Sequence, residues 1–282
     1  TVKSFPPIRV FGTIGFIFSM LLVDSTGFQD SYNQFFASAA WGAVLALYSL
    51  SLPHCPVNND AGGKSLVSAL GFGSFALFKE KRMAIFFIFS MLLGAALQIS
   101  NGYANPYING FGEYPEYAGT FAVEHTNMLI SLSQLSETLC ILLIPTFLSK
   151  FGIKRVMIVA MLAWVCRFFF FAVGNPGVPG VFMFALSMLV YGVAFDFFNI
   201  SGSLFVNNEV PESMRSSAQG LFMLMTNGFG ASIGVVAAQE VVNYFTKNQT
   251  FFGGWPIVWY IFAGYALLIA ILFAFIFKEK KV

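Results

Sequence analysis

Long apolar stretches separated by short polar ones dominate this chain. A helix needs about 20 mostly apolar residues to cross the hydrocarbon core of a bilayer, and eight stretches come close to or exceed that length. They lie at residues 8–26, 33–52, 83–104, 127–148, 153–174, 180–206, 215–245 and 255–277. They lack the alternation of β-barrel strands and are far too long for them. The pattern therefore predicts an all-α membrane protein, a bundle with about eight transmembrane helices.

The composition agrees with this prediction. Of the 282 residues, 57% are hydrophobic and 10% are charged, whereas a soluble domain is about 25% charged. With a mean hydropathy of +0.74, disordered, disulfide-rich secreted and nucleic-acid-binding proteins are excluded. Cys140 and Cys166 lie in apolar runs, where they are most simply small reduced hydrophobes. His54 and His125 lie in polar connections, so neither a metal site nor a cofactor is expected.

Lysine and arginine residues distinguish the two sides of the predicted bundle. Cytoplasmic loops of membrane proteins carry an excess of these residues. Twelve of the 15 fall on one side and only Lys247 falls on the other, while Arg9 and Arg167 lie within spans. Both ends of this chain are therefore expected in the cytoplasm. The opposite side carries acidic residues, namely Asp24, Asp30, Glu113, Glu116 and Glu124.

The longest connection, residues 53–82, divides the spans into two and six. That split suits a transporter built from two six-helix halves that has lost its first four helices. Residues 1–52 would then be the last two helices of the N-terminal half, and residues 83–282 the whole C-terminal half. The chain begins at Thr1 with neither Met nor a signal peptide, which fits a truncated beginning.

Three long motifs resemble the bacterial nucleoside:proton symporter family of the major facilitator superfamily. They are FPPIRVFGTIGF at Phe5–Phe16, FALFKEKRMAIFFIFSMLLG at Phe75–Gly94 and YGVAFDFFNISGS at Tyr191–Ser203. The connections Leu148–Arg155 and Glu209–Arg215 are similar to loops of the superfamily. The resemblance implies a twelve-helix bundle, of which this chain holds spans five to twelve. It also implies proton-coupled uptake of nucleosides across the bacterial inner membrane by alternating access.

Two acidic residues lie where lipid would surround a helix. Glu137 and Asp196 fall near the middle of their spans, and an ionised carboxylate there costs about 2.5–3.5 kcal/mol. Burial favours the protonated form, so each carboxyl can titrate inside the membrane, as proton coupling requires. The alternative is a structural acid that hydrogen-bonds between helices. Arg167, also near mid-span, is expected to have a structural partner.

Polar side chains recur at helical spacing on several spans. Four such stripes are present: Gln98, Asn101 and Asn105; Asn127, Ser131, Gln134 and Thr138, with Glu137 alongside; Tyr191, Phe195 and Asn199, beside Asp196; and Gln219, Met223 and Asn227. Amides, carboxylates and aromatic rings at one depth suit a neutral ligand with a flat ring, such as a nucleoside. Alternatively, the amides simply hold helices together, which is common in membrane bundles.

The family resemblance assigns ten positions to a central substrate cavity: Arg9, Thr13, Phe16, Gln98, Asn101, Gln134, Glu137, Tyr191, Phe195 and Asp196. Of these, Asp196, Arg9 and Glu137 are implied in proton coupling, with Arg9 facing Asp196 across the two halves. By its position alone, Arg9 could instead extend to the lipid headgroups.

Two other functions remain open from the residues. One is a major facilitator symporter for a sugar or another small polar solute. The other is a membrane scaffold or channel-like protein whose polar residues only join helices. An enzyme is not expected, because the sequence has no phosphate-binding loop, no HExxH motif and no Cys/His cluster.

Overall fold

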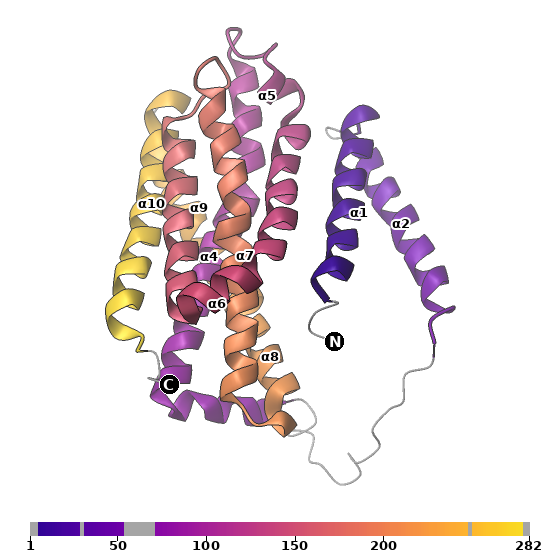
Figure 1. Ribbon diagram of the computed structural model, residues 1–282. Coiled ribbons are helices and arrows are strands. Elements are labelled where there is room, and N and C mark those ends of the chain that lie inside the picture. The colour runs from indigo at the N-terminus through magenta and orange to yellow at the C-terminus, as the bar shows by residue number, and fades with distance from the viewer. Residues whose placement is uncertain (1–4, 29–30, 54–70, 248–249, 279–282) are drawn as a thin grey trace.

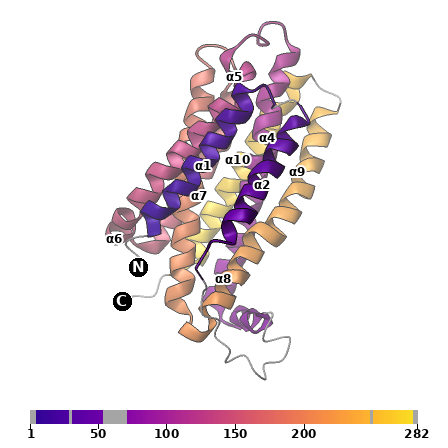
Figure 2. The ribbon, with the colours of Figure 1, turned by 90° about the vertical axis from the view of Figure 1, so that its right-hand side faces the viewer.

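The computed structural model describes residues 5–28, 31–53, 71–247 and 250–278, with only the helical backbone described for residues 5–9. Within these ranges every regular element is a helix. The helices run side by side as a bundle, with α1 and α2 across one face of it (Figures 1 and 2). The expected all-α architecture is confirmed.

The eight predicted spans all appear as helices. The first two are α1 (Phe5–Ser25) and α2 (Asn33–Ser49), and the bundle then contains α4 (Lys81–Gly110), α6 (Thr126–Val173), α7 (Val181–Glu209), α8 (Arg215–Met223), η4 (Leu224–Gly230), α9 (Ala231–Thr246) and α10 (Phe251–Ile276). Five helical segments among the described residues are long and apolar enough to cross a membrane, and they begin with α4. One of these, α6, contains two of the predicted spans.

The helices depart from regular α-helical geometry at two places, within α6 and at η4. The chain turns inside α6 at Gly152, whose φ of 76° and ψ of 166° are not helical and favour glycine. The predicted spans 127–148 and 153–174 lie on either side of it. The predicted span 215–245 is continuous through α8, η4 and α9, but η4 is a π-helix. Such wide turns are rare and frequently occur at functional sites.

Short elements occupy the connections. They are η1 (Phe72–Lys79), η2 (Phe111–Glu113), α5 (Phe121–Glu124) and η3 (Glu212–Met214). The connection 53–82 is therefore partly ordered, because η1 forms just before α4. Its residues 54–70 lie outside the described part of the chain, as do Lys3, Lys64, Lys280 and Lys281.

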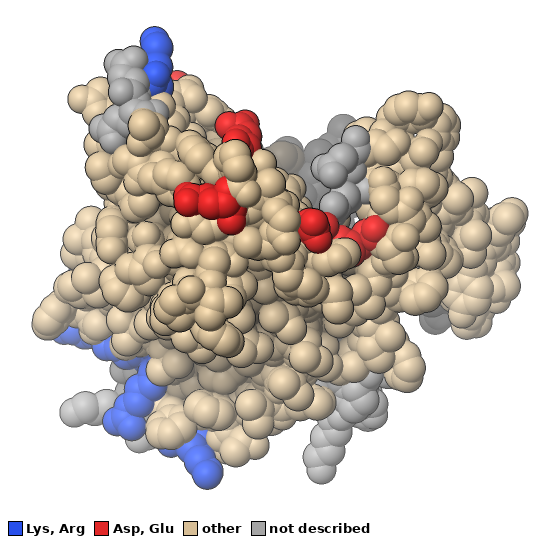
Figure 3. Space-filling model, turned by 90° about the horizontal axis from the view of Figure 1, so that it is seen from above, with Lys and Arg blue, Asp and Glu red and all other residues tan. Residues whose placement is uncertain are grey.

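The two ends of the bundle differ in charge. At the α5 end, acidic side chains are exposed, while lysine and arginine lie mostly at the rim of that view (Figure 3). At the other end Arg82 pairs with Glu209 at 2.5 Å, and Lys154 Nζ donates to the carbonyl of Ala274 at 2.8 Å. The separation of charge that the sequence predicts is therefore present in the fold.

Small residues let the helices approach closely, as in other membrane bundles. A Cβ on Gly192 of α7 would lie 2.5 Å from the carbonyl carbon of Ser136 and 2.7 Å from the amide nitrogen of Glu137. The Ser136 hydroxyl also donates to the carbonyl oxygen of Leu189. The backbones of α6 and α7 are therefore in contact, and this contact fixes the height of Glu137 against Tyr191.

The first two helices are less enclosed than the others. α1 packs mainly against α6, and His125 Nδ1 lies 3.2 Å from Asp24 Oδ2 where the two helices meet at the α5 end. α2 has no buried residue, and its large apolar side chains, such as Phe35, are exposed.

Candidate functional site

Tyr191 is the residue on which the predicted polar stripes converge. It lies on α7 with 6% of its surface exposed. Its ring stacks on Phe195, with centroids 5.7 Å apart and planes 19° apart. Its hydroxyl interacts electrostatically with Asn101 of α4, with Glu137 of α6 and with Asp196. Polar and charged side chains of three helices therefore act on this hydroxyl.

The two membrane acids occupy the same neighbourhood. Asp196 is fully buried on α7, while Glu137 on α6 is partly exposed. Both interact electrostatically with the thiol of Cys140, one turn after Glu137, and both with Tyr191. The two carboxyls that the sequence selects therefore both act on Tyr191, one from α6 and one from α7.

Some of the predicted amides hold helices together. Asn105 Nδ2 donates to Asn127 Oδ1 at 3.0 Å, and Asn109 Nδ2 donates to Asn105 Oδ1 at 2.8 Å. Gln219 Nε2 donates to the carbonyl of Ser203 at 2.7 Å. The Asn105–Asn127 and Gln219–Ser203 bonds join neighbouring helices, whereas the Asn109–Asn105 bond lies within α4. The proposed binding role therefore does not include Asn105 or Gln219.

Other amides are not engaged in this way. Gln98 and Gln134 are partly exposed and make no side-chain hydrogen bond to any residue that the structure describes. Gln98 lies one turn before Asn101 on α4, and Gln134 lies one turn before Glu137 on α6. Their donors and acceptors are therefore available on the faces that carry the Tyr191 contacts.

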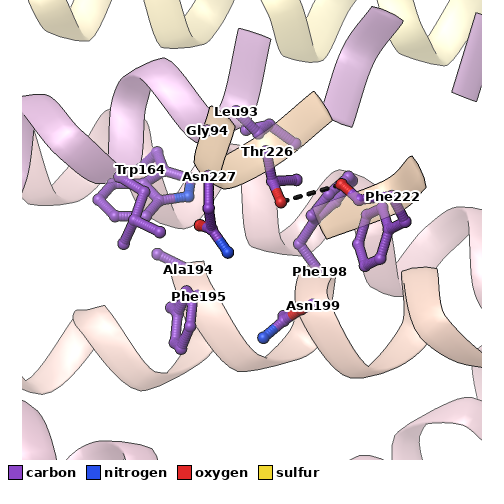
Figure 4. Close-up of a pocket in the computed structure, with 11 residues that line it drawn as sticks. Leu93, Gly94, Trp164, Ala194, Phe195, Phe198, Asn199, Phe222, Thr226 and Asn227 are labelled. Carbon is purple, nitrogen blue, oxygen red and sulfur yellow. Dashed lines mark hydrogen bonds between the residues drawn. The ribbon is translucent and has the colours of Figure 1, made fainter. Parts of the chain in front are cut away.

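A pocket between α4, α7 and the π-helix shares Phe195 with this cluster but is not lined by Tyr191, Glu137 or Asp196 (Figure 4). Phe195 and Asn199 from α7 line it together with Asn227 from η4. The buried indole of Trp164 forms part of its wall. Phe195 and Asn199 of the α7 stripe therefore meet Asn227 of the seventh-span stripe in one space, whereas Gln219 lies in a helix contact.

Three site residues are expected on α1, and the structure describes the side chains of two of them. Thr13 is 6% exposed and Phe16 is 53% exposed. The side chain of Arg9 lies outside the described part of the structure, so its expected pairing with Asp196 stays a prediction.

The sequence alone does not identify the hydrogen-bond and aromatic partners of Arg167. It is 3% exposed on α6. Its Nε donates to Ser100 Oγ at 2.8 Å, and its Nη1 donates to the carbonyl of Ser187 at 2.6 Å. Its guanidinium carbon lies 4.6 Å from the centroid of the Tyr191 ring. Its expected structural partner is thus found, and Arg167 also contacts the centre of the site.

Sequence reasoning misses the pocket wall formed by Gly94, Trp164 and Thr226. The spacing of Gly230 and Gly234 could have indicated a close helix contact, because small residues four apart face one neighbour. Among the described residues, no group of three or more His, Cys, Asp or Glu side chains could hold a metal ion.

The sequence of this chain is similar to a known protein family and to known permeases. The profile of the nucleoside H⁺ symporter family matches residues 1–282. The nucleoside permease NupG of Escherichia coli K12 is 50% identical over 281 residues, which cover 100% of this chain and 67% of that protein. The xanthosine permease of the same organism is 49% identical over 277 residues, with 98% and 66% covered.

Solved structures show the same likeness. A crystal structure of the nucleoside transporter NupG superposes with a TM-score of 0.84 at 50% identity, covering 99% of this chain and 68% of that one. A crystal structure of a NupG mutant gives a TM-score of 0.89, covering 98% and 68%. The chain thus spans about two thirds of the length of these relatives.

Proposed function

The chain belongs to the nucleoside H⁺ symporter family, and on this premise we propose that the Tyr191 cluster is where it binds nucleosides for proton-coupled uptake across the bacterial inner membrane. The protein is a transporter and not an enzyme. The single observation that carries the proposed site is the position of Gln98 and Gln134. They are amides without a described hydrogen-bond partner, and they lie one turn from Asn101 on α4 and from Glu137 on α6, the two residues that act on Tyr191.

The chemistry of the cluster suits a nucleoside. Free amides can donate to and accept from ribose hydroxyls and base edges, and a stacked pair such as Tyr191 and Phe195 offers a flat apolar surface to a base. Thr13 and Phe16 of α1 would contribute from the opposite half. In a membrane scaffold, by contrast, these amides should be engaged with neighbouring helices, as Asn105 and Gln219 are.

Asp196 and Glu137 are the proposed proton-coupling residues. Asp196 is fully buried at mid-span, where an ionised carboxylate is costly. We propose that it gains and loses a proton during the transport cycle, with Arg9 as its counterion in the opposite half. Glu137, which shares the electrostatic surroundings of Tyr191, would carry the proton or orient the substrate.

The proposed architecture is that of two halves in a lipid bilayer. Residues 1–52 would be the last two helices of the N-terminal half, residues 53–82 the cytoplasmic connection, and residues 83–282 the C-terminal half. Four further helices of the parent protein would cover the exposed apolar face of α2. The basic end of the bundle would face the cytoplasm, with both ends of this chain on that side.

Substrate class is tested by competition. The full-length protein, reconstituted in vesicles, should take up labelled uridine, and unlabelled nucleosides should compete while hexoses should not. Uptake should require a proton gradient. Competition by sugars and not by nucleosides would favour the sugar symporter, and failure to transport or bind either class would favour a scaffold.

The free amides give a sharper prediction. Gln98→Ala and Gln134→Ala should each weaken nucleoside binding by about two- to tenfold, since a hydrogen bond contributes about 0.5–1.5 kcal/mol. Thermal stability should change little. Equilibrium binding of labelled uridine to purified full-length protein measures the first effect, and thermal unfolding measures the second.

Gln219→Ala is the matched control. It removes an amide that bridges α7 and α8, so it should lower the melting temperature and leave the uridine Kd within twofold. If Gln98→Ala and Gln134→Ala behave like Gln219→Ala, these amides are helix contacts and the proposed site is wrong.

A further inference from the structure

Arg167 is a buried cation that the proposed transport cycle does not use. It lies near the middle of the second span of α6 and is 3% exposed. The ion pairs among the described residues do not include it. An arginine in such a place is costly and usually functional in membrane proteins, so its contacts need an explanation.

Those contacts join α4, which carries Asn101, to α7, which carries Tyr191. On α4 the Nε–H donates to Ser100 Oγ at 2.8 Å, and Ser100 immediately precedes Asn101. On α7 an Nη1–H donates to the carbonyl of Ser187 at 2.6 Å, one turn before Tyr191. The Ser187 hydroxyl donates back to the carbonyl of Arg167 at 3.0 Å.

The guanidinium also contacts the Tyr191 ring directly. Its central carbon lies 4.6 Å from the ring centroid and 5.3 Å from that of Phe171. A cation over an aromatic face is attracted by the ring, and more strongly when both are desolvated. One planar group therefore orients the Tyr191 ring and holds the residue that precedes Asn101. A lysine cannot do both, because it lacks the planar fork of donors.

We propose that Arg167 is a positioning residue for nucleoside binding. It holds the Tyr191 ring and, through Ser100, the turn of α4 that carries Asn101 in place before the substrate arrives, so that binding does not have to order them. Arg167 is buried and can fulfil this role without contacting the substrate. The inference rests on the proposed function, because it concerns the same site.

The test is a double-mutant cycle on the purified full-length protein with labelled uridine. Arg167→Lys should raise the uridine Kd about tenfold in protein that remains folded. In an Asn101→Ala background the same change should raise it less than twofold, because the amide that Arg167 positions through Ser100 is already lost. A tenfold effect in both backgrounds, or no effect in the first, would overturn the proposal.

Arg82→Lys is the matched control. Arg82 is another arginine packed over aromatic rings, 4.9 Å from the Phe205 centroid, but at the basic end of the bundle. Its replacement should lower the melting temperature and leave the uridine Kd within twofold. An increase in Kd equal to that of Arg167→Lys would show that any lost buried arginine contact weakens binding, and would also overturn the proposal.

A milder variant covers the case in which Arg167→Lys does not fold. Ser100→Ala removes only the acceptor of the Nε–H and should raise the uridine Kd about threefold. Ser90→Ala on the same helix, where the hydroxyl donates to the carbonyl of Phe86 at 2.8 Å, should leave it unchanged. Equal values for both serine variants would contradict the proposal. Failure of the wild-type protein to bind uridine would instead contradict the proposed function.

Discussion

Asp196→Asn is expected to abolish proton-driven accumulation of nucleosides while nucleoside binding survives. Asparagine has nearly the shape of a protonated aspartate and cannot release a proton. At a fully buried position it should therefore hold the protein in the equivalent of its protonated state. For one proton per nucleoside, a membrane potential of 100 mV contributes about 2.3 kcal/mol, which corresponds to about 40-fold accumulation. The Asp196→Asn variant should therefore not accumulate the nucleoside above its external concentration.

The measurement separates accumulation from exchange. In vesicles with an imposed gradient, the wild-type protein should concentrate labelled uridine and the Asp196→Asn variant should only equilibrate it. Counterflow of labelled against unlabelled uridine should persist, because it needs no net proton movement. Glu240→Gln, which alters an exposed acid on α9, serves as control and should accumulate normally. Uridine accumulation by Asp196→Asn at the wild-type level would exclude this residue as the coupling group.

The positions of the helices could be predicted closely because the bilayer imposes a single dominant rule. Apolar length alone separates spans from connections, and even the two spans joined in α6 are recognisable from the polar residues around Gly152. The π-helix η4 could not be predicted. Its backbone packs against α4, a helix more than 100 residues earlier in the chain, and local sequence carries no information about that contact.

The sequence predicts which face of each helix carries the site residues, but it does not predict which of these residues contact one another. Helical spacing places Asn101 and Asn105 on one face, but it cannot show that Asn105 hydrogen-bonds to Asn127 whereas Asn101 acts electrostatically on Tyr191. The same holds for Arg167, whose acceptors are a hydroxyl on α4 and a backbone carbonyl on α7. Such partners come from distant segments, and the sequence pattern of a single helix carries no information about them.

The contact between α4 and η4 gives the largest expected effect on stability. Gly94 lines the pocket, and a Cβ there would overlap the Thr226 carbonyl oxygen and lie 2.7 Å from the carbonyl carbon. The obstacle is backbone, so no side-chain rotation can relieve it. On the other side of the same contact, a Cβ on Gly230 would overlap the carbonyl oxygen of Met91. Neither helix can therefore move away without losing this packing.

Gly94→Ala should consequently destabilise the protein by more than about 3 kcal/mol, at or above the upper end of overpacking effects. Gly102→Ala on the same helix is the matched control, because a Cβ there meets nothing within 4 Å, and alanine favours helix by about 1 kcal/mol over glycine. Thermal unfolding and the yield of monodisperse full-length protein in detergent measure both variants. Gly94→Ala should lose most folded protein and its uridine binding, and Gly102→Ala should match or exceed the wild type. Equal stability of the two variants would mean that α4 and η4 are not held as closely as the structure shows, and that the pocket they enclose is wider.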